Sequence, residues 1–169
     1  AFLDRIHYYL PGWEVPKLEA RLFTNHFGFV SDYFAEALRQ LRKDSYVRAI
    51  DDEFALGSQL SARDEKAVRK TVSGLLKILH PHGEWKRTEL REYLEFALEG
   101  RRRVKEQLKK LAAHDYAKTS FSYLERDSGH EYWVGLPEQP DDMAPALADL
   151  EDEGRESFPE AVAQTLTQA

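Results

Sequence analysis

The sequence contains no cysteine, only one methionine, and no apolar stretch approaching the length of a membrane span. Without cysteine, the chain cannot form disulfide bonds or bind zinc through thiolates. A transmembrane helix needs about 20 mostly apolar residues, and neither such a run nor a secretory signal peptide is visible. These absences favour a cytoplasmic protein that does not contact a membrane.

Several motifs of catalysis are also missing. The sequence has neither a G-x-x-x-x-G-K-[ST] phosphate loop nor a G-x-S-x-G nucleophile elbow. We therefore expect that the chain alone is not catalytic and binds no ATP. His80 and His82 flank Pro81 in a predicted turn, with no acidic or cysteine partner nearby, so we expect no metal site.

The charge balance limits the class of partner. Among 169 residues, 24 are basic and 30 acidic, which gives a net charge of -6. This balance argues against a general nucleic-acid-binding protein but leaves room for a local basic face. The length fits one domain, or one domain with a tail. Because the chain opens on Ala1 within what looks like the middle of a domain, we expect a piece of a longer protein.

The chain is organised around a helix predicted over residues 61–81. Ser61 reads as its N-cap, Asp64 and Glu65 lie in its first turn, and Pro81 ends it. Apolar residues recur at helical spacing along this segment, which predicts one buried face. The helix also carries two arginines, Arg63 and Arg69. Such residues suit contact with a nucleotide phosphate, and equally a solvated surface.

Further patterns predict a mainly α fold with a short C-terminal β-hairpin. Apolar spacing predicts helices over residues 2–10, 26–43, 45–56 and 88–112, each with one buried face; Gly100 is expected to interrupt or kink the last. Alternating segments 120–124 and 131–136 around Asp127-Ser128-Gly129 predict the hairpin. We divide the chain into an N-terminal piece (1–25), a helical unit (26–113), the hairpin (114–137) and a loosely ordered acidic tail (138–169).

Six basic residues lie between Arg101 and Lys110, opposed only by Glu106. We expect part of this run to form an exposed basic stripe opposite Val104 and Leu108. A solvated face, a subunit contact and weak contact with a nucleic-acid phosphate backbone all remain open. The nucleic-acid candidates are Arg101, Arg102, Lys105 and Lys109. The order helix, turn, basic helix and hairpin also matches a winged helix, so a DNA-binding module is an alternative.

Longer blocks of sequence resemble one family. They are Leu3-Asp4-Arg5-Ile6-His7, Leu10-Pro11-Gly12-Trp13-Glu14, the segment 63–70 with Leu75-Leu76-Lys77 and His80-Pro81, Glu92-Tyr93-Leu94-Glu95 and the segment 99–110. Together they are similar to the C-terminal part of the ATPase region in the Lon-like AAA+ proteins of bacterial BREX phage-defence systems, the BrxL family. The likeness runs from Phe2 to about Val134.

The resemblance implies an AAA+ helical lid preceded by a remnant of the ATPase core. Arg5 would be an arginine finger that acts in trans, and Arg63 a nucleotide-sensing arginine, with Arg69 as the fallback. ATP and Mg²⁺ would be bound by the parent protein. The family also implies an upstream AAA+ core, neighbouring subunits of a hexameric ring, and DNA as partners. The chain departs from the family pattern because it lacks the Walker motifs and ends in an acidic tail. A non-catalytic scaffold that packs through its aromatic N-terminus is a further alternative.

Overall fold

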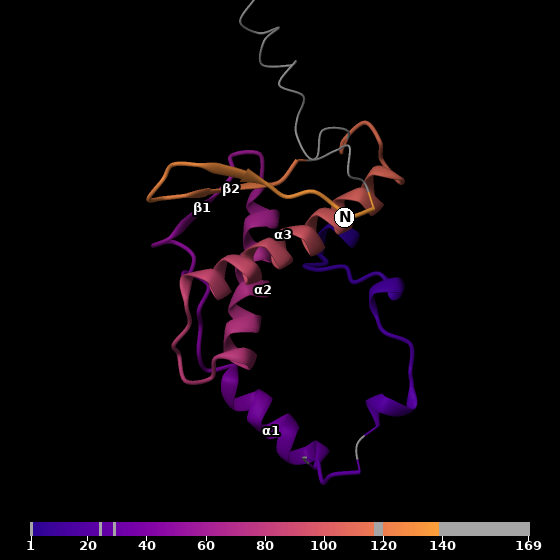
Figure 1. Cartoon of the computed structure of the whole chain (residues 1–169). Helices are drawn as coiled ribbons and strands as arrows, with labels where there is room; N and C mark the ends of the chain where they lie inside the picture. The colour runs from indigo at the N-terminus through magenta and orange to yellow at the C-terminus, as the bar shows by residue number, and fades with distance from the viewer. Residues whose placement is uncertain (1, 24, 29, 117–119, 139–169) are drawn as a thin grey trace, which may run out of the picture.

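The computed structural model describes residues 2–23, 25–28, 30–116 and 120–138 (Figure 1). Within this part, three α-helices accompany a small antiparallel sheet, so the predicted mainly α class with a C-terminal hairpin is confirmed. The helices are α1 (Ser31–Leu41), α2 (Ala62–Leu79) and α3 (Arg87–Lys109), and the strands are β1 (Phe54–Leu56), β2 (Ser122–Glu125) and β3 (Glu131–Trp133). No helix in these described ranges is long and apolar enough to cross a membrane.

Helix α2 forms as its sequence predicts. Ser61 and Asp64 make a reciprocal cap: the Asp64 amide donates to Ser61 Oγ at 3.4 Å, and the Ser61 amide donates to Asp64 Oδ2 at 3.1 Å. Val68, Val72 and Leu76 are fully buried on the face that meets the core. The helix ends at Leu79, shortly before Pro81, because a residue preceding proline disfavours the helical region.

Helix α3 crosses α2 and supplies the other side of the core. Its first half buries Leu90, Leu94 and Leu98, and it continues through Gly100 without a break. The expected interruption at Gly100 is therefore wrong. Gly100 instead allows a close approach, because a Cβ at this position would come within 2.0 Å of the Tyr8 ring. The Tyr9 amide donates to the Gly100 carbonyl at 3.1 Å.

The sheet has one more strand than expected. β2 and β3 form the predicted hairpin, with Tyr123 opposite Tyr132. The helix predicted over residues 45–56 is wrong, because this segment makes successive turns and then the edge strand β1. β1 pairs with β2, and Phe54 packs edge-to-face on Tyr123 with ring centroids 5.6 Å apart. Burial of Phe54 against the sheet thus outweighs the helical spacing of the segment.

The N-terminal segment is more extended than predicted. Instead of a helix over residues 2–10, it forms short 3₁₀ turns at Leu3–Arg5, Gly12–Glu14 and Ala20–Leu22. It lies across α3, where Tyr8 stacks on Phe96, and then runs in a wide arc to α1 (Figure 1). The helix predicted over 26–43 shrinks to α1, and none of its residues is buried, so its expected buried face is also wrong.

The contact between Tyr8 and Gly100 yields a stability test. We expect Gly100→Ala to lower the free energy of unfolding by about 1–3 kcal/mol, because the new methyl group must displace the half-buried ring of Tyr8. Gly74→Ala is the matched control: Gly74 also lies within a helix, but nothing stands within 4 Å of its Cβ position. This variant should gain up to about 1 kcal/mol through helix propensity. Urea titrations measure the free energy of unfolding of both variants. If Gly100→Ala stabilised the fold as much as Gly74→Ala, the predicted clash would be contradicted.

Candidate functional site

Asp4 is the centre of a buried charge network. Its side chain is only 5% exposed, and three cationic side chains from α2 and α3 surround it. Arg63 Nη1 lies 2.6 Å from Asp4 Oδ2, while Arg101 Nη2 and Lys105 Nζ lie 2.8 and 3.0 Å from Asp4 Oδ1. One carboxylate therefore joins the N-terminal turn to both long helices.

Asp64 is the second carboxylate of this network. Arg101 Nε donates to Asp64 Oδ1 at 2.7 Å, and Lys105 Nζ lies 3.3 Å from the same oxygen. The other oxygen of Asp64 accepts from Ser61, so the residue that caps α2 also binds α3. With three cations against two carboxylates, the network has one positive charge in excess.

Arg101 also fixes the backbone of the N-terminal turn. Its Nη2 donates to the Asp4 carbonyl oxygen at 3.0 Å, and its Nη1 donates to the Ile6 carbonyl oxygen. These carbonyls belong to the residues on either side of Arg5, which is itself exposed. The turn therefore presents Arg5 outward from a backbone that is held on both flanks.

The electrostatics of this region favour negative partners. Burial alone would raise the pKa of Asp4, but Arg63, Lys105 and Arg101 together outweigh burial and lower it to about 2. The pKa of His7 is lowered by burial and by the nearby cations of Lys70, Arg101 and Lys66.

The exposed cations of α2 belong to the same surface. Arg63, Lys66 and Lys70 are exposed and follow one another at spacings of three and four residues, so they share one face of the helix. With the exposed Arg5, they make a positive surface around the N-terminal turn. Such a surface can bind an anion such as a phosphate group.

The basic run of α3 is not the exposed stripe that its sequence suggested. Arg101, Arg102 and Lys105 are buried, and their charges meet groups of the same chain. Lys109 is the most accessible of the four DNA candidates and pairs with Glu106 at 2.9 Å. The expectation of an exposed stripe is therefore wrong, whereas DNA binding by these residues stays a prediction.

Arg69 is placed away from the network. Its Nη1 bonds Asp51 Oδ1 at 2.5 Å and the Val47 carbonyl oxygen at 3.3 Å. It therefore holds the turns before β1 against α2. Arg63, with 65% of its side chain exposed, is the better placed of the two nucleotide-sensing candidates.

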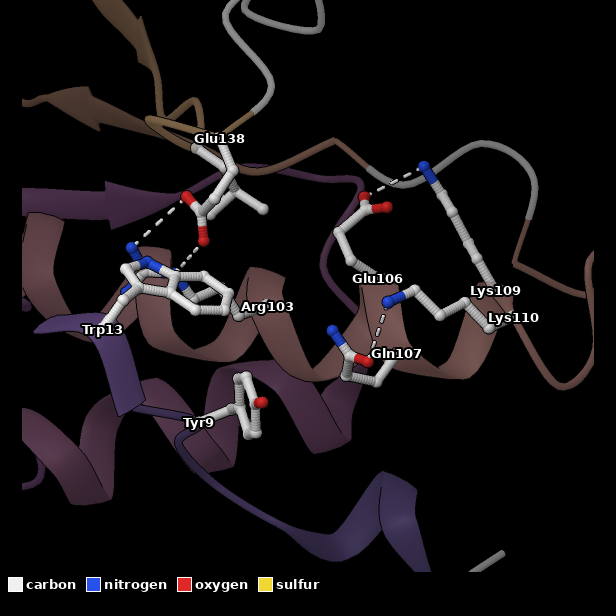
Figure 2. A pocket seen from close by; sticks show the side chains of 9 residues that line it. Tyr9, Trp13, Arg103, Glu106, Gln107, Lys109, Lys110 and Glu138 are labelled. Atoms are coloured by element: carbon white, nitrogen blue, oxygen red, sulfur yellow. Dashed lines mark hydrogen bonds and ion pairs between the residues drawn. The ribbon is translucent and has the colours of Figure 1, made fainter. Parts of the chain in front are cut away.

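A second cluster surrounds Arg103 beside a cavity of about 370 Å³ (Figure 2). Arg103 pairs with Glu14, Glu99 and Glu138, and this crowding of carboxylates, after burial itself, raises the pKa of Glu99. Figure 2 also shows Lys109 and Lys110 bonded to Glu106 and Gln107. Because these cations already have protein partners, the cluster reads as a structural contact.

Within the described ranges, no group of three or more histidine, aspartate or glutamate side chains could hold a metal ion. His80 belongs to a buried contact instead, with its Nε2 2.9 Å from the Tyr93 hydroxyl. Its ring lies 5.7 Å from that of His82, centroid to centroid.

Comparison with protein families gives the class of this chain as an ATPase domain. The matching model, described as the ATPase domain of Lon-like protease BrxL-like proteins, covers residues 1–122. The chain belongs to this BrxL-like family, which confirms the resemblance found in the sequence.

Two curated relatives support the same conclusion. A Lon-like protease BrxL of Bacillus cereus (strain H3081.97) is 54% identical over 139 residues, covering 82% of this chain and 21% of the relative. A Lon-like protease BrxL of Escherichia coli O9:H4 (strain HS) is 50% identical over 139 residues, covering 82% and 20%. The chain therefore spans about a fifth of the length of these relatives.

The low pKa of Asp4 predicts a loss of stability in acid. A carboxylate whose folded pKa is about 2, below its usual 3.8, stabilises the fold above the usual value and loses this effect as the pH falls towards 2. We expect the free energy of unfolding to fall between about pH 5 and pH 2, and Asp4→Asn to flatten this slope. Guanidinium titrations at several pH values measure it. The control Asp52→Asn, at an exposed position, should keep the slope of the unmodified chain.

Proposed function

We propose that this chain is the helical lid part of a Lon-like AAA+ ATPase that senses bound ATP and couples its hydrolysis to the motion of a ring. Arg63 contacts the nucleotide of its own subunit, and Arg5 reaches the nucleotide of a neighbour. The observation that carries this proposal is the ion pair between Arg63 and Asp4, because it brings the two candidate arginines to one turn.

The charges on this surface suit contacts with nucleotide phosphates. Arg5, Arg63, Lys66 and Lys70 are exposed near the turn, and the buried carboxylates Asp4 and Asp64 are already balanced by the buried cations Arg101 and Lys105, so the exposed cations are not neutralised from beneath. Because the chain has no phosphate loop, the phosphate cradle and the Mg²⁺ ligands would come from an upstream AAA+ core. When bound there, ATP and Mg²⁺ supply the phosphoryl chemistry. The arginines of this chain would stabilise negative charge on the phosphate oxygens.

The exposed apolar arc supports a role in contacts with other parts of an assembly. Between Trp13 and Phe34, large apolar side chains are exposed rather than packed: Trp13, Val15, Leu18, Leu22, Phe23, Phe27, Val30, Tyr33 and Phe34. Large exposed apolar surfaces mark protein interfaces. We assign this surface to the upstream core and neighbouring subunits of a hexameric ring. The same feature also suits the alternative of a non-catalytic scaffold.

A cytoplasmic location and a part in BREX phage defence, with DNA as a partner of the parent protein, complete the proposal. The proposal also includes the division of the chain at residues 25, 113 and 137 into a core remnant, a lid and a hairpin. Most of the acidic tail, residues 139–169, lies outside the described residues.

Arg63 is tested in a full-length family member that carries this segment. Arg63→Ala should lower ATP turnover about 100-fold or more, since a phosphate-contacting arginine stabilises charge that develops in the transition state. Steady-state hydrolysis assays measure this effect. Arg48→Ala is the control, because Arg48 is 91% exposed and lies in the turns before β1. Unchanged turnover in Arg63→Ala would remove the assignment.

Arg5 is tested by mixing subunits. Rings built only of Arg5→Ala subunits should keep a low but measurable rate of ATP hydrolysis, and rings built only of subunits with a disabled Walker motif should be inactive, yet mixtures of the two should regain part of the activity. Mixed rings contain interfaces where an intact Arg5 faces an intact nucleotide site, which accounts for the expected recovery. Titration of the mixing ratio measures it. Absence of recovery at every ratio would argue against action in trans.

A further inference from the structure

We propose that Arg101 is the positioning residue of the arginine finger: it fixes the direction of Arg5 and connects this residue to Arg63 through Asp4. The inference rests on the proposed function for the roles of Arg5 and Arg63. It gives Arg101 a role different from the nucleic-acid contact expected from the sequence.

The contacts of Arg101 engage every nitrogen of its guanidinium. Nε donates to Asp64 Oδ1 at 2.7 Å, Nη1 donates to the Ile6 carbonyl, and Nη2 donates to both the carbonyl and Oδ1 of Asp4 at 3.0 and 2.8 Å. The side chain is 0% exposed. A lysine ammonium carries the same charge but lacks the planar fork, so it cannot reproduce this set of bonds.

The two carbonyls that Arg101 holds lie immediately before and after Arg5. A third backbone bond, from the Tyr9 amide to the Gly100 carbonyl, fixes the chain a few residues further on. Gly100 and Arg101, which are adjacent in α3, therefore hold the backbone of the N-terminal turn. The side chain of Arg5 takes no part in these contacts and remains exposed. Such an arrangement reduces the conformational freedom that a catalytic arginine must lose before it reaches a phosphate.

The connection to Arg63 runs through the two oxygens of one carboxylate. Asp4 Oδ2 binds Arg63, and Asp4 Oδ1 binds Arg101 and Lys105. When Arg63 turns towards a phosphate, Asp4 loses one cationic partner and its bonds to Arg101 and Lys105 strengthen. The occupancy of the nucleotide site in one subunit thereby affects the turn that presents Arg5 to the next.

Tryptic cleavage of the chain itself tests the positioning. Trypsin cuts after Arg5, between the residues that Arg101 holds, and cleavage requires that the turn opens. Arg101→Lys should speed this cut about tenfold relative to the cut after the exposed Arg48 in the same molecule, because two backbone hydrogen bonds are lost. Arg103→Lys is the matched control: it is equally buried on α3 but binds only carboxylates, and its ratio should stay within about twofold of the unmodified chain.

The internal ratio separates local opening from general unfolding, which accelerates both cuts together. If Arg101→Lys does not fold, as judged by circular dichroism, Asp4→Asn takes its place, with the expectation that the Arg5 cut again rises relative to the Arg48 cut. An unchanged ratio in the folded variant would overturn the proposal.

Turnover in the full-length family member tests the connection to catalysis. Arg101→Lys should lower kcat about tenfold with KM changed less than about twofold, and should cause no further loss on an Arg5→Ala background, because it acts through Arg5. An additional loss in the double variant would overturn this role. If Arg5→Ala alone had full activity, the proposed function would fail, yet the tryptic ratio would still report whether Arg101 holds the turn.

Discussion

The architecture around the N-terminal turn depends on the burial of the Asp4 carboxylate among three cations. Removing such groups from water is costly, and a buried ion network contributes little net stability relative to apolar packing. Loss of one of its buried members, such as Arg101 or Asp4, is nevertheless expensive, about 3–5 kcal/mol, because the remaining charges stay buried without compensation. The network therefore determines which surfaces of α2, α3 and the turn meet, while the apolar residues between α2 and α3 supply the stability.

The elements that the sequence predicted well are those whose signals are local. The reciprocal cap of Ser61 and Asp64, and the turn at Gly129, lie within a few residues of the structures they define. β1 could not be found in this way, since its strand character comes from pairing with β2, far along the chain, and from the burial of Phe54. The N-terminal segment likewise follows the surface of α3 rather than its own apolar spacing.

The contacts of the site were even harder to predict from local sequence signals than the fold was. Arg63 and Arg5 are proposed as nucleotide contacts because their sequence blocks resemble a family, whereas the role proposed for Arg101 depends on a partner 97 residues away. A run of basic residues at helical spacing carries no signal that tells a solvated face from one covered by two distant segments. The one local sign was Gly100, whose missing side chain allows the N-terminal segment to approach α3 so closely.

The chemistry of the network explains why charged residues, rather than apolar ones, hold this turn. An apolar contact can press a turn against a helix, but it is not directional and leaves the turn free to rotate. The guanidinium of Arg101 binds backbone oxygens on both sides of Arg5 in fixed directions, which an apolar side chain cannot do. The network therefore costs desolvation free energy, but it fixes the orientation of the turn that carries Arg5. The role proposed for Arg5 requires such an orientation, because an arginine that meets a phosphate of a neighbouring subunit must do so in one geometry.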